Sequence, residues 1–281
     1  MSTWDARRQG EAGPRNQPAD AAAQFRNLCR SSPWKWQSLR FEYVDRPAPG
    51  TGNPGSAGTA ADTGTDNPDP GNTVRAWLRR PGALRLESAA GVVLHSTTGI
   101  NDSKDGFYVS STRKSWLLPP QLVTPVFDDG GLVRRRPEAA YGEPCFGNGR
   151  FAAALDPVEL AGNAPVPIEF PNLNAVELGP VTAVDHQGRP ALETVAIPNA
   201  AYRPSDPGAP LCRPGRNLIR IDVGTGVCVS SRSLENEWKD LGHWLRILAV
   251  DEYMLDDLFL AESMNLTDVR RHISWDISRG V

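Results

Sequence analysis

Apolar and polar residues alternate along several short segments of this chain, and a two-residue period of this kind predicts β-strands. The clearest case is residues 74–99, VRAWLRRPGALRLESAAGVVLHSTTG, in which Val74, Ala76 and Leu78 share one face. Leu84 and Leu86 repeat the pattern after a Pro-Gly turn. We therefore predict an antiparallel meander with one face toward a core and the other toward solvent.

The same period occurs before and after the meander. Leu39, Phe41 and Tyr43 alternate with charged residues, which predicts a half-buried strand. In the last third of the chain, strand-like segments flank two turns, at residues 186–188 and 223–226, and the segment HWLRILAVDEY follows them. Glycine in these turns favours tight hairpins. The pattern predicts roughly nine to eleven strands.

A helical period is confined to short stretches. Phe25, Leu28 and Cys29 predict a helix over residues 19–30, which we expect to end before Pro33. Residues 156–159, DPVE, have the N-cap residue, the proline and the acidic residue that begin a helix. Strands and helices do not alternate along the chain, so a parallel dinucleotide-binding sheet is not expected.

Segments without either period occur inside one predicted domain and at its two ends. Residues 47–72 are rich in proline and glycine and contain no large apolar residue, so we predict a flexible insert. Residues 115–127 are apolar but interrupted by prolines, and we expect them to lie across an open sheet face. The prediction is an N-terminal tail over residues 1–18, one domain over residues 19–265 and a C-terminal tail over residues 266–281.

Composition and charge narrow the class of protein. The chain has 281 residues, of which 40% are hydrophobic and 22% charged, enough for a sizeable core. Its net charge of -3 provides no basic field for nucleic acid, which is not an expected partner. Arginine greatly outnumbers lysine, a bias typical of a GC-rich bacterial genome. No apolar run has the length of a signal peptide or of a transmembrane helix, so we expect a cytoplasmic protein.

Residues with reactive side chains are scattered. The four cysteines have no metal-ligand spacing and are expected to be reduced, with Cys228 a small core residue. The four histidines are isolated, and neither a P-loop nor a nucleophile elbow is present. We expect turns at residues 128–131 and 147–149 and a solvated loop at residues 134–136. The sequence therefore predicts no catalytic residue, no metal and no cofactor.

Aromatic residues leave two interpretations open. Six of the eight tryptophans lie in or beside predicted strands: Trp34, Trp36, Trp77, Trp116, Trp238 and Trp244. Ordinary core packing explains such positions, and so does an aromatic-lined cavity on the concave side of a curved sheet.

Two segments carry a resemblance to a known family. VRAWLRRPGALRLESAAG resembles the second and third strands of the LolA-like superfamily, which includes the LolA, LolB, LppX and RseB types. IRIDVGTGVCVSSRSLENE, with the later Asp257-Leu258-Phe259, resembles a hairpin and turn of the same superfamily. The resemblance implies a mainly β (α+β) fold, in which a curved antiparallel sheet forms an open half-barrel with short helices over its concave face. It also implies an apolar cavity for acyl chains or similar ligands, in a bacterial member without an export signal.

From this we predict a non-enzymatic protein that binds a hydrophobic ligand in the concave face. The expected lining residues are apolar positions of the meander and the late strands, with two residues of the proline-interrupted segment as covers: Val74, Ala76, Leu78, Leu84, Leu86, Leu245 and Ile247, with Trp116 and Leu117. A protein-interaction or regulatory module, using edge strands or residues 47–72, is the alternative. A hydrolase dependent on His95 or His186 is a third hypothesis.

Overall fold

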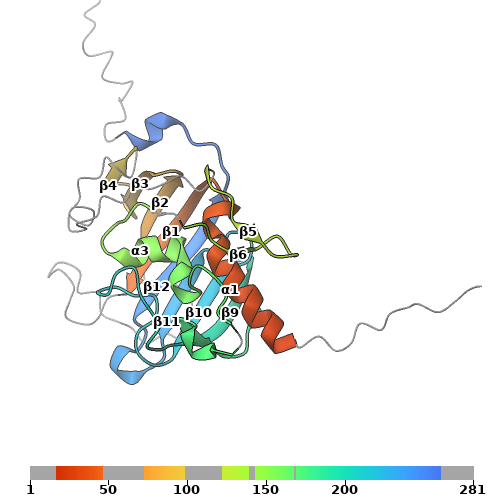
Figure 1. The fold of residues 1–281 in the computed structure, drawn as a ribbon. Coiled ribbons are helices and arrows are strands. Elements are labelled where there is room, and N and C mark those ends of the chain that lie inside the picture. Colours follow the sequence, from red (N-terminus) through yellow and green to blue (C-terminus); the bar gives the residue numbers. More distant parts are fainter. Residues whose placement is uncertain (1–16, 47–72, 99–121, 139–142, 168, 261–281) are drawn as a thin grey trace, which may run out of the picture.

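A computed structural model describes residues 17–46, 73–98, 122–138, 143–167 and 169–260 of the chain. Ten strands of these residues form one antiparallel sheet (Figure 1). The strands of the sheet are β1 (Ser38–Arg46), β2 (Val74–Arg79), β3 (Ala83–Ser88), β4 (Val93–Thr97), β7 (Val176–Leu178), β8 (Thr182–His186), β9 (Arg189–Pro198), β10 (Asn217–Asp222), β11 (Cys228–Ser233) and β12 (Gly242–Val250). A separate hairpin consists of β5 (Val126–Phe127) and β6 (Val133–Arg135).

The order of strands follows the sequence within two blocks. The sheet runs β4-β3-β2-β1-β12-β11-β10-β9-β7, and β8 also pairs with β9. Within β1–β4 and within β8–β12 each strand pairs with the next one in the chain, whereas β7 pairs with β9, and β1 pairs with β12. This single long-range pairing joins the N-terminal meander to the C-terminal hairpins.

The register places the apolar side chains of neighbouring strands on one face. Leu39 lies opposite Leu78, which in turn lies opposite Leu84. Phe41 pairs in the same way with Ala76. Since side chains alternate between the faces of a strand, this register turns the side chains of Leu39, Ala76 and Leu86, and the apolar residues in phase with them, toward the core.

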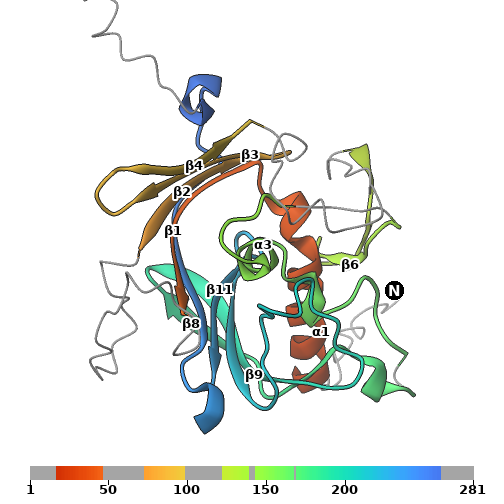
Figure 2. The same ribbon diagram turned by 90° about the vertical axis from the view of Figure 1, so that its left-hand side faces the viewer.

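The sheet is curved and does not close. Figure 2 shows it bending around the helices α1 (Gln17–Lys35) and α3 (Gly149–Leu155), which lie on its concave side. No pairing joins β4 to β7 or β8 among the described residues. The fold class predicted from the sequence, an α+β fold with an open, curved antiparallel sheet, is confirmed.

Helix α1 is longer than predicted, because it continues through Pro33 to Lys35. The Arg80 guanidinium, at the end of β2, donates hydrogen bonds to the carbonyl oxygens of Ser32, Pro33 and Trp36 at 2.8–3.2 Å. These carbonyls belong to the group at a helix C-terminus that has no partner within the helix. The prediction that the helix ends before Pro33 was wrong because the stabilising side chain comes from a distant strand.

A turn between two C-terminal strands packs against α1. Gly226, between β10 and β11, has a φ of +73°, and a Cβ there would meet the Leu28 carbonyl oxygen at 2.8 Å. Glycine is thus required both for the backbone conformation and for the close approach of the helix. This contact fixes α1 against the concave face.

Short 3-10 turns complete the described chain: η3 (Pro157–Leu160), η4 (Pro171–Leu173), η5 (Asn236–Trp238) and η6 (Asp256–Phe259). At η3, the predicted helix start differs from the structure, because the Asp156 side chain makes no capping hydrogen bond. It pairs instead with the Arg136 guanidinium. A long-range ion pair has replaced the local cap.

Several predicted segments lie outside the described residues, namely the insert at residues 47–72 and most of the proline-interrupted segment at residues 115–127. In the part that is described, no helix is both long and apolar enough to cross a membrane.

Candidate functional site

The concave face of the sheet carries a continuous apolar surface. It is built from β3, β2, β1 and β12 and packs against α1, α3 and η3. The apolar side chains that these four strands direct toward the core are called the apolar end of the concave face: Leu39, Phe41, Ala76, Leu78, Leu84, Leu86 and Ile247. Burial of this much apolar surface is the main source of stability for the fold.

The lining residues predicted from the sequence lie together on this surface. Their side chains are fully buried in the hydrophobic core, except that Val74 is half-buried and packs against it: Ala76, Leu78, Leu84, Leu86, Leu245 and Ile247. Trp116 and Leu117, the predicted covers, lie outside the described residues. The residues therefore share a face, and all of them except Val74 contact protein side chains and not solvent.

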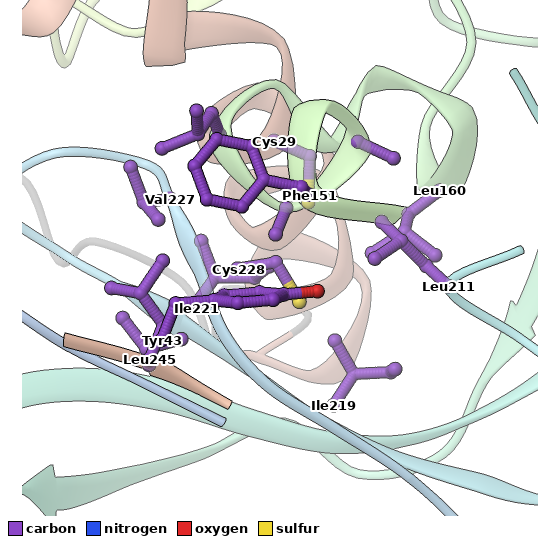
Figure 3. Close-up of a cluster of buried hydrophobic side chains, with 14 of the residues drawn as sticks. Cys29, Tyr43, Phe151, Leu160, Leu211, Ile219, Ile221, Val227, Cys228 and Leu245 are labelled. Carbon is purple, nitrogen blue, oxygen red and sulfur yellow. The ribbon is translucent and has the colours of Figure 1, made fainter. Parts of the chain in front are cut away.

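Sequence reasoning missed the residue that fills this face. Phe151, on α3, is 1% exposed, and its ring centroid lies 5.7 Å from that of Phe41 and 5.0 Å from that of Tyr43. The ring centroid of Phe146 lies 6.3 Å from that of Phe151. Figure 3 shows Phe151 and Tyr43 on facing sides of the buried cluster, with Cys228 beside Tyr43. The strand period could mark Phe41 and Tyr43, but no local pattern identified Phe151 as their partner.

Polar groups replace apolar ones toward the start of α3. Arg150 is buried and donates hydrogen bonds to the Asp45 carboxylate at 2.5 Å, to the Gly242 carbonyl at 3.0 Å and to the Pro210 carbonyl at 3.1 Å. Asn148 donates to the same carboxylate at 2.6 Å. We call the polar end of the concave face Tyr43, Asp45, Asn148, Arg150 and His243.

Two members of the polar end are neutral and incompletely bonded. Burial lowers the pKa of His243 to about 3, and the nearby Arg150 guanidinium acts in the same direction. Burial, together with the Asp45 carboxylate, raises the pKa of Tyr43 well above its usual value. Neither the Tyr43 hydroxyl nor His243 Nδ1 has a hydrogen-bond partner among the residues that the structure describes.

The thiols in the core are chemically quiet. Cys29, Cys212 and Cys228 are buried, as predicted for Cys228, and burial raises the pKa of Cys29 to about 12. Burial also raises the pKa of the other two thiols well above its usual value. A thiol in this state is a poor nucleophile. Within the described ranges, no histidines, cysteines or carboxylates are grouped as metal ligands.

The histidines that the hydrolase hypothesis names do not meet. His95 is on β4 and His186 is on β8, at opposite ends of the strand order. His186 Nε2 lies 2.9 Å from the Leu245 carbonyl oxygen, so it donates to the backbone of β12. This is a structural contact, and it leaves His186 buried.

Buried arginines fasten the loops to the concave side, which the sequence did not reveal. Arg30 donates to the carbonyl oxygens of Ala161, Gly162 and Ala164 at 2.7–3.0 Å. Arg136 donates to the Arg30 carbonyl at 2.9 Å and is 4% exposed. The predicted solvated loop at residues 134–136 is therefore wrong for Arg136, although its two preceding arginines are exposed.

The tryptophans contribute to packing in different places. Trp36 is buried in the main core, with the Arg80 guanidinium 3.3 Å from its ring centroid. Trp77 lies on the opposite face of the sheet and packs against a second small cluster with Met254 and Phe259. Of the two interpretations left open by the sequence, core packing therefore applies to Trp36.

Comparison with known proteins gives limited information. No family model and no curated protein sequence matches the chain. The crystal structure of MucB is similar, with a TM-score of 0.33 and 13% sequence identity. The match covers 87% of this chain and 64% of the MucB chain, so this chain spans just under two thirds of that protein. The likeness is one of fold alone.

Proposed function

We propose that this chain is a non-enzymatic binding domain that holds a hydrophobic molecule, such as a lipid acyl chain, against the concave face of its sheet. The observation that carries the proposal is the position of Phe151. This side chain lies between the apolar and polar ends and contacts both Phe41 and Tyr43. An apolar ligand at the same place would make the contacts that the phenyl ring makes.

The surroundings of Phe151 support the proposal. An open sheet has a concave face that must be covered, and the cover over Phe41 and Tyr43 is a helix of only seven residues. Polar contacts of Asn148, Gly149 and Arg150 hold its first residues. With α3 held in this way, rotation of the Phe151 ring alone is the simplest movement that admits a ligand.

The test compares ligand uptake by three forms of the full chain. Each is equilibrated with 1-decanol, and bound probe is counted by native mass spectrometry. We expect wild type to bind one probe and Phe151→Ala to bind it several-fold more tightly, because removal of the ring leaves an apolar cavity of the kind that accepts apolar guests. Phe127→Ala removes an exposed phenyl ring on β5 and is the matched control, with unchanged binding.

Absence of bound probe from both wild type and Phe151→Ala would contradict the proposal. Binding that is equal in all three forms would place the ligand elsewhere on the molecule.

A second candidate function is favoured by strand β4. In the described part of the chain β4 pairs with β3 on one edge only, and Val92, Val93 and Leu94 expose 61%, 37% and 46% of their surface. An open strand edge with apolar side chains can pair with an extended segment of another protein. We propose as occupant a peptide with apolar residues at alternate positions.

Selection of such peptides against the immobilised chain tests this candidate. Leu94→Lys should weaken binding of the selected peptides, because a charge on an edge strand opposes pairing. Leu173→Lys, at an equally exposed leucine in η4, is the control. Peptides that bind both variants equally would exclude β4 as their site.

A further inference from the structure

Two neutral polar groups lie side by side on the concave face. Tyr43 is on β1 and pairs with Leu245 on β12, two residues beyond His243. The rings of Tyr43 and His243 are stacked, with centroids 5.8 Å apart and an interplanar angle of 19°. Tyr43 is 3% exposed and His243 is 0% exposed. Both groups are thus withdrawn from solvent at one place.

The hydrogen bond of His243 fixes where its proton lies. His243 Nε2 is 2.8 Å from the Cys228 carbonyl oxygen, which can only accept, so Nε2 carries the hydrogen. In a neutral imidazole the other nitrogen is then a bare acceptor. Nδ1 therefore presents a lone pair with no partner among the described residues. A buried acceptor without a donor is rare in folded proteins.

Tyr43 supplies the complementary group. Its hydroxyl is a donor and has no hydrogen-bond partner within the described chain. The neighbouring charged groups, the Arg150 guanidinium and the Asp45 carboxylate, do not bond to the Tyr43 hydroxyl. They bond to each other at 2.5 Å. The concave face thus contains one unused acceptor and one unused donor in adjacent side chains, and the Tyr43 ring contacts Phe151.

We propose that Tyr43 and His243 bind a neutral, hydroxyl-bearing head group, while the apolar part of the same molecule lies against Phe41 in the place of Phe151. The ligand hydroxyl donates to His243 Nδ1 and accepts from the Tyr43 hydroxyl. This inference rests on the proposed function and names its ligand class, an aliphatic alcohol.

Other head groups fit the same atoms less well. A carboxylate has only acceptors and leaves the lone pair of His243 Nδ1 without a donor. It would also add a second anion beside Asp45, whose charge Arg150 already balances. An ammonium group would bring a charge into a buried site with no free carboxylate to pair with it among the described groups. A hydroxyl group is small and neutral and has both a donor and acceptors.

The experiment uses three probes of equal chain length on the full wild-type chain: 1-decanol, decyl methyl ether and decanoate at pH 7. Bound probe is measured by native mass spectrometry over a concentration series. We expect 1-decanol to bind about tenfold more tightly than the ether, which lacks the donor, and more tightly than decanoate; one well-made hydrogen bond corresponds to about that factor.

Variants assign the preference to the named atoms. Tyr43→Phe removes the donor to the ligand oxygen and should reduce the affinity for 1-decanol and for the ether several-fold, because both oxygens accept a hydrogen bond. Tyr253→Phe, at a tyrosine that is 86% exposed, is the matched control and should change neither. Thermal unfolding of each variant confirms that it is folded. The three-probe series on wild type is informative without any variant.

The outcomes separate this inference from the proposed function. Equal affinity of the alcohol and the ether would overturn the inference and leave the binding function standing, and would mean that the two groups hold only water. An affinity for 1-decanol that Tyr43→Phe leaves unchanged would also overturn it. If no probe binds to wild type or to Phe151→Ala, the proposed function itself fails.

Discussion

The two ends of the concave face are adjacent on the same strands but are held together in different ways. At the apolar end, side chains from neighbouring strands meet across the sheet, as Leu78 and Leu84 do. At the polar end, Arg150 crosses from α3 to reach Asp45 on β1 and the Gly242 carbonyl on β12. The first arrangement is non-directional, whereas the second depends on individual hydrogen bonds.

This difference has a consequence for function. An apolar surface tolerates the replacement of one apolar partner by another, so a ligand can take the place of Phe151 at modest cost. A hydrogen-bonded arrangement requires each donor and acceptor to be matched. We therefore expect affinity to come from the apolar end and selectivity from Tyr43 and His243.

Removal of a side chain at the apolar end should have the largest effect on stability. Leu84 is fully buried, and Leu84→Ala should lower the free energy of unfolding by about 3 kcal/mol through lost burial and the cavity left behind. Urea denaturation measures the change. Leu94→Ala, at an exposed leucine of the neighbouring strand β4, should change it by less than about 0.5 kcal/mol. Similar losses in both variants would mean that the core does not extend over β3.

Loss of the central arginine tests the polar end. Arg150→Met should lower the free energy of unfolding by about 2 kcal/mol, because the Asp45 carboxylate and two backbone carbonyls lose their donor. The Asp45 side chain is 27% exposed, so water compensates in part. The double variant Asp45→Asn with Arg150→Met should recover some of the loss. A double variant less stable than the single one would show that the ion pair is not the important contact.

Titration of His243 gives the polar end a dependence on pH. Because the pKa of His243 falls from 6.5 to about 3 on burial, the unfolded chain binds a proton below pH 6.5 that the folded chain does not. His243 therefore does not change the free energy of unfolding above pH 6.5. As pH falls from 6.5 toward 3, protonation of this residue in the unfolded chain lowers the free energy of unfolding by about 1 kcal/mol per pH unit. The charged or titratable groups near it are Arg150, Arg46 and His186, with Tyr43 stacked on its ring and Asp45 opposite it in the sheet.

The measurement is chemical denaturation of wild type and His243→Gln between pH 4 and pH 7. The glutamine cannot titrate, so its free energy of unfolding should fall less steeply with decreasing pH. Parallel curves for the two proteins would contradict a neutral, buried His243.

The smallest effect is expected for the hydroxyl of Tyr43. Without a ligand, Tyr43→Phe should leave stability unchanged or raise it by up to about 1 kcal/mol, because the hydroxyl has no partner among the described residues. Thermal unfolding detects such a change. A clear loss of stability would mean that the hydroxyl already has a bonding partner in the unliganded protein.

The strands could be predicted from the sequence because their signal is local. The alternation around Leu39, Phe41 and Tyr43 placed β1 and its buried face, and glycine in the turn at residues 223–226 placed the β10–β11 hairpin. The register of β2 and β3 follows from the same alternation with the Pro-Gly turn between them. The lining residues that the sequence placed on one face do share it.

Tertiary structure alone decided the partners of the polar residues. The Arg30 guanidinium donates to the carbonyl oxygen of Gly162, which is 132 positions away in the chain. No sequence period of two or four residues indicates such a contact. Two other arginines also make long-range contacts that the sequence does not indicate. Arg80 stabilises the end of α1 beyond Pro33, and Arg136 binds the Asp156 side chain, which was expected to cap the following turn. The sequence by itself determined where strands form and which side is apolar, because burial follows short-range periodicity. Only the folded chain determined that Phe151 covers that side and that Tyr43 and His243 meet beneath it, because hydrogen bonds and ring contacts form between whichever residues the tertiary fold brings together.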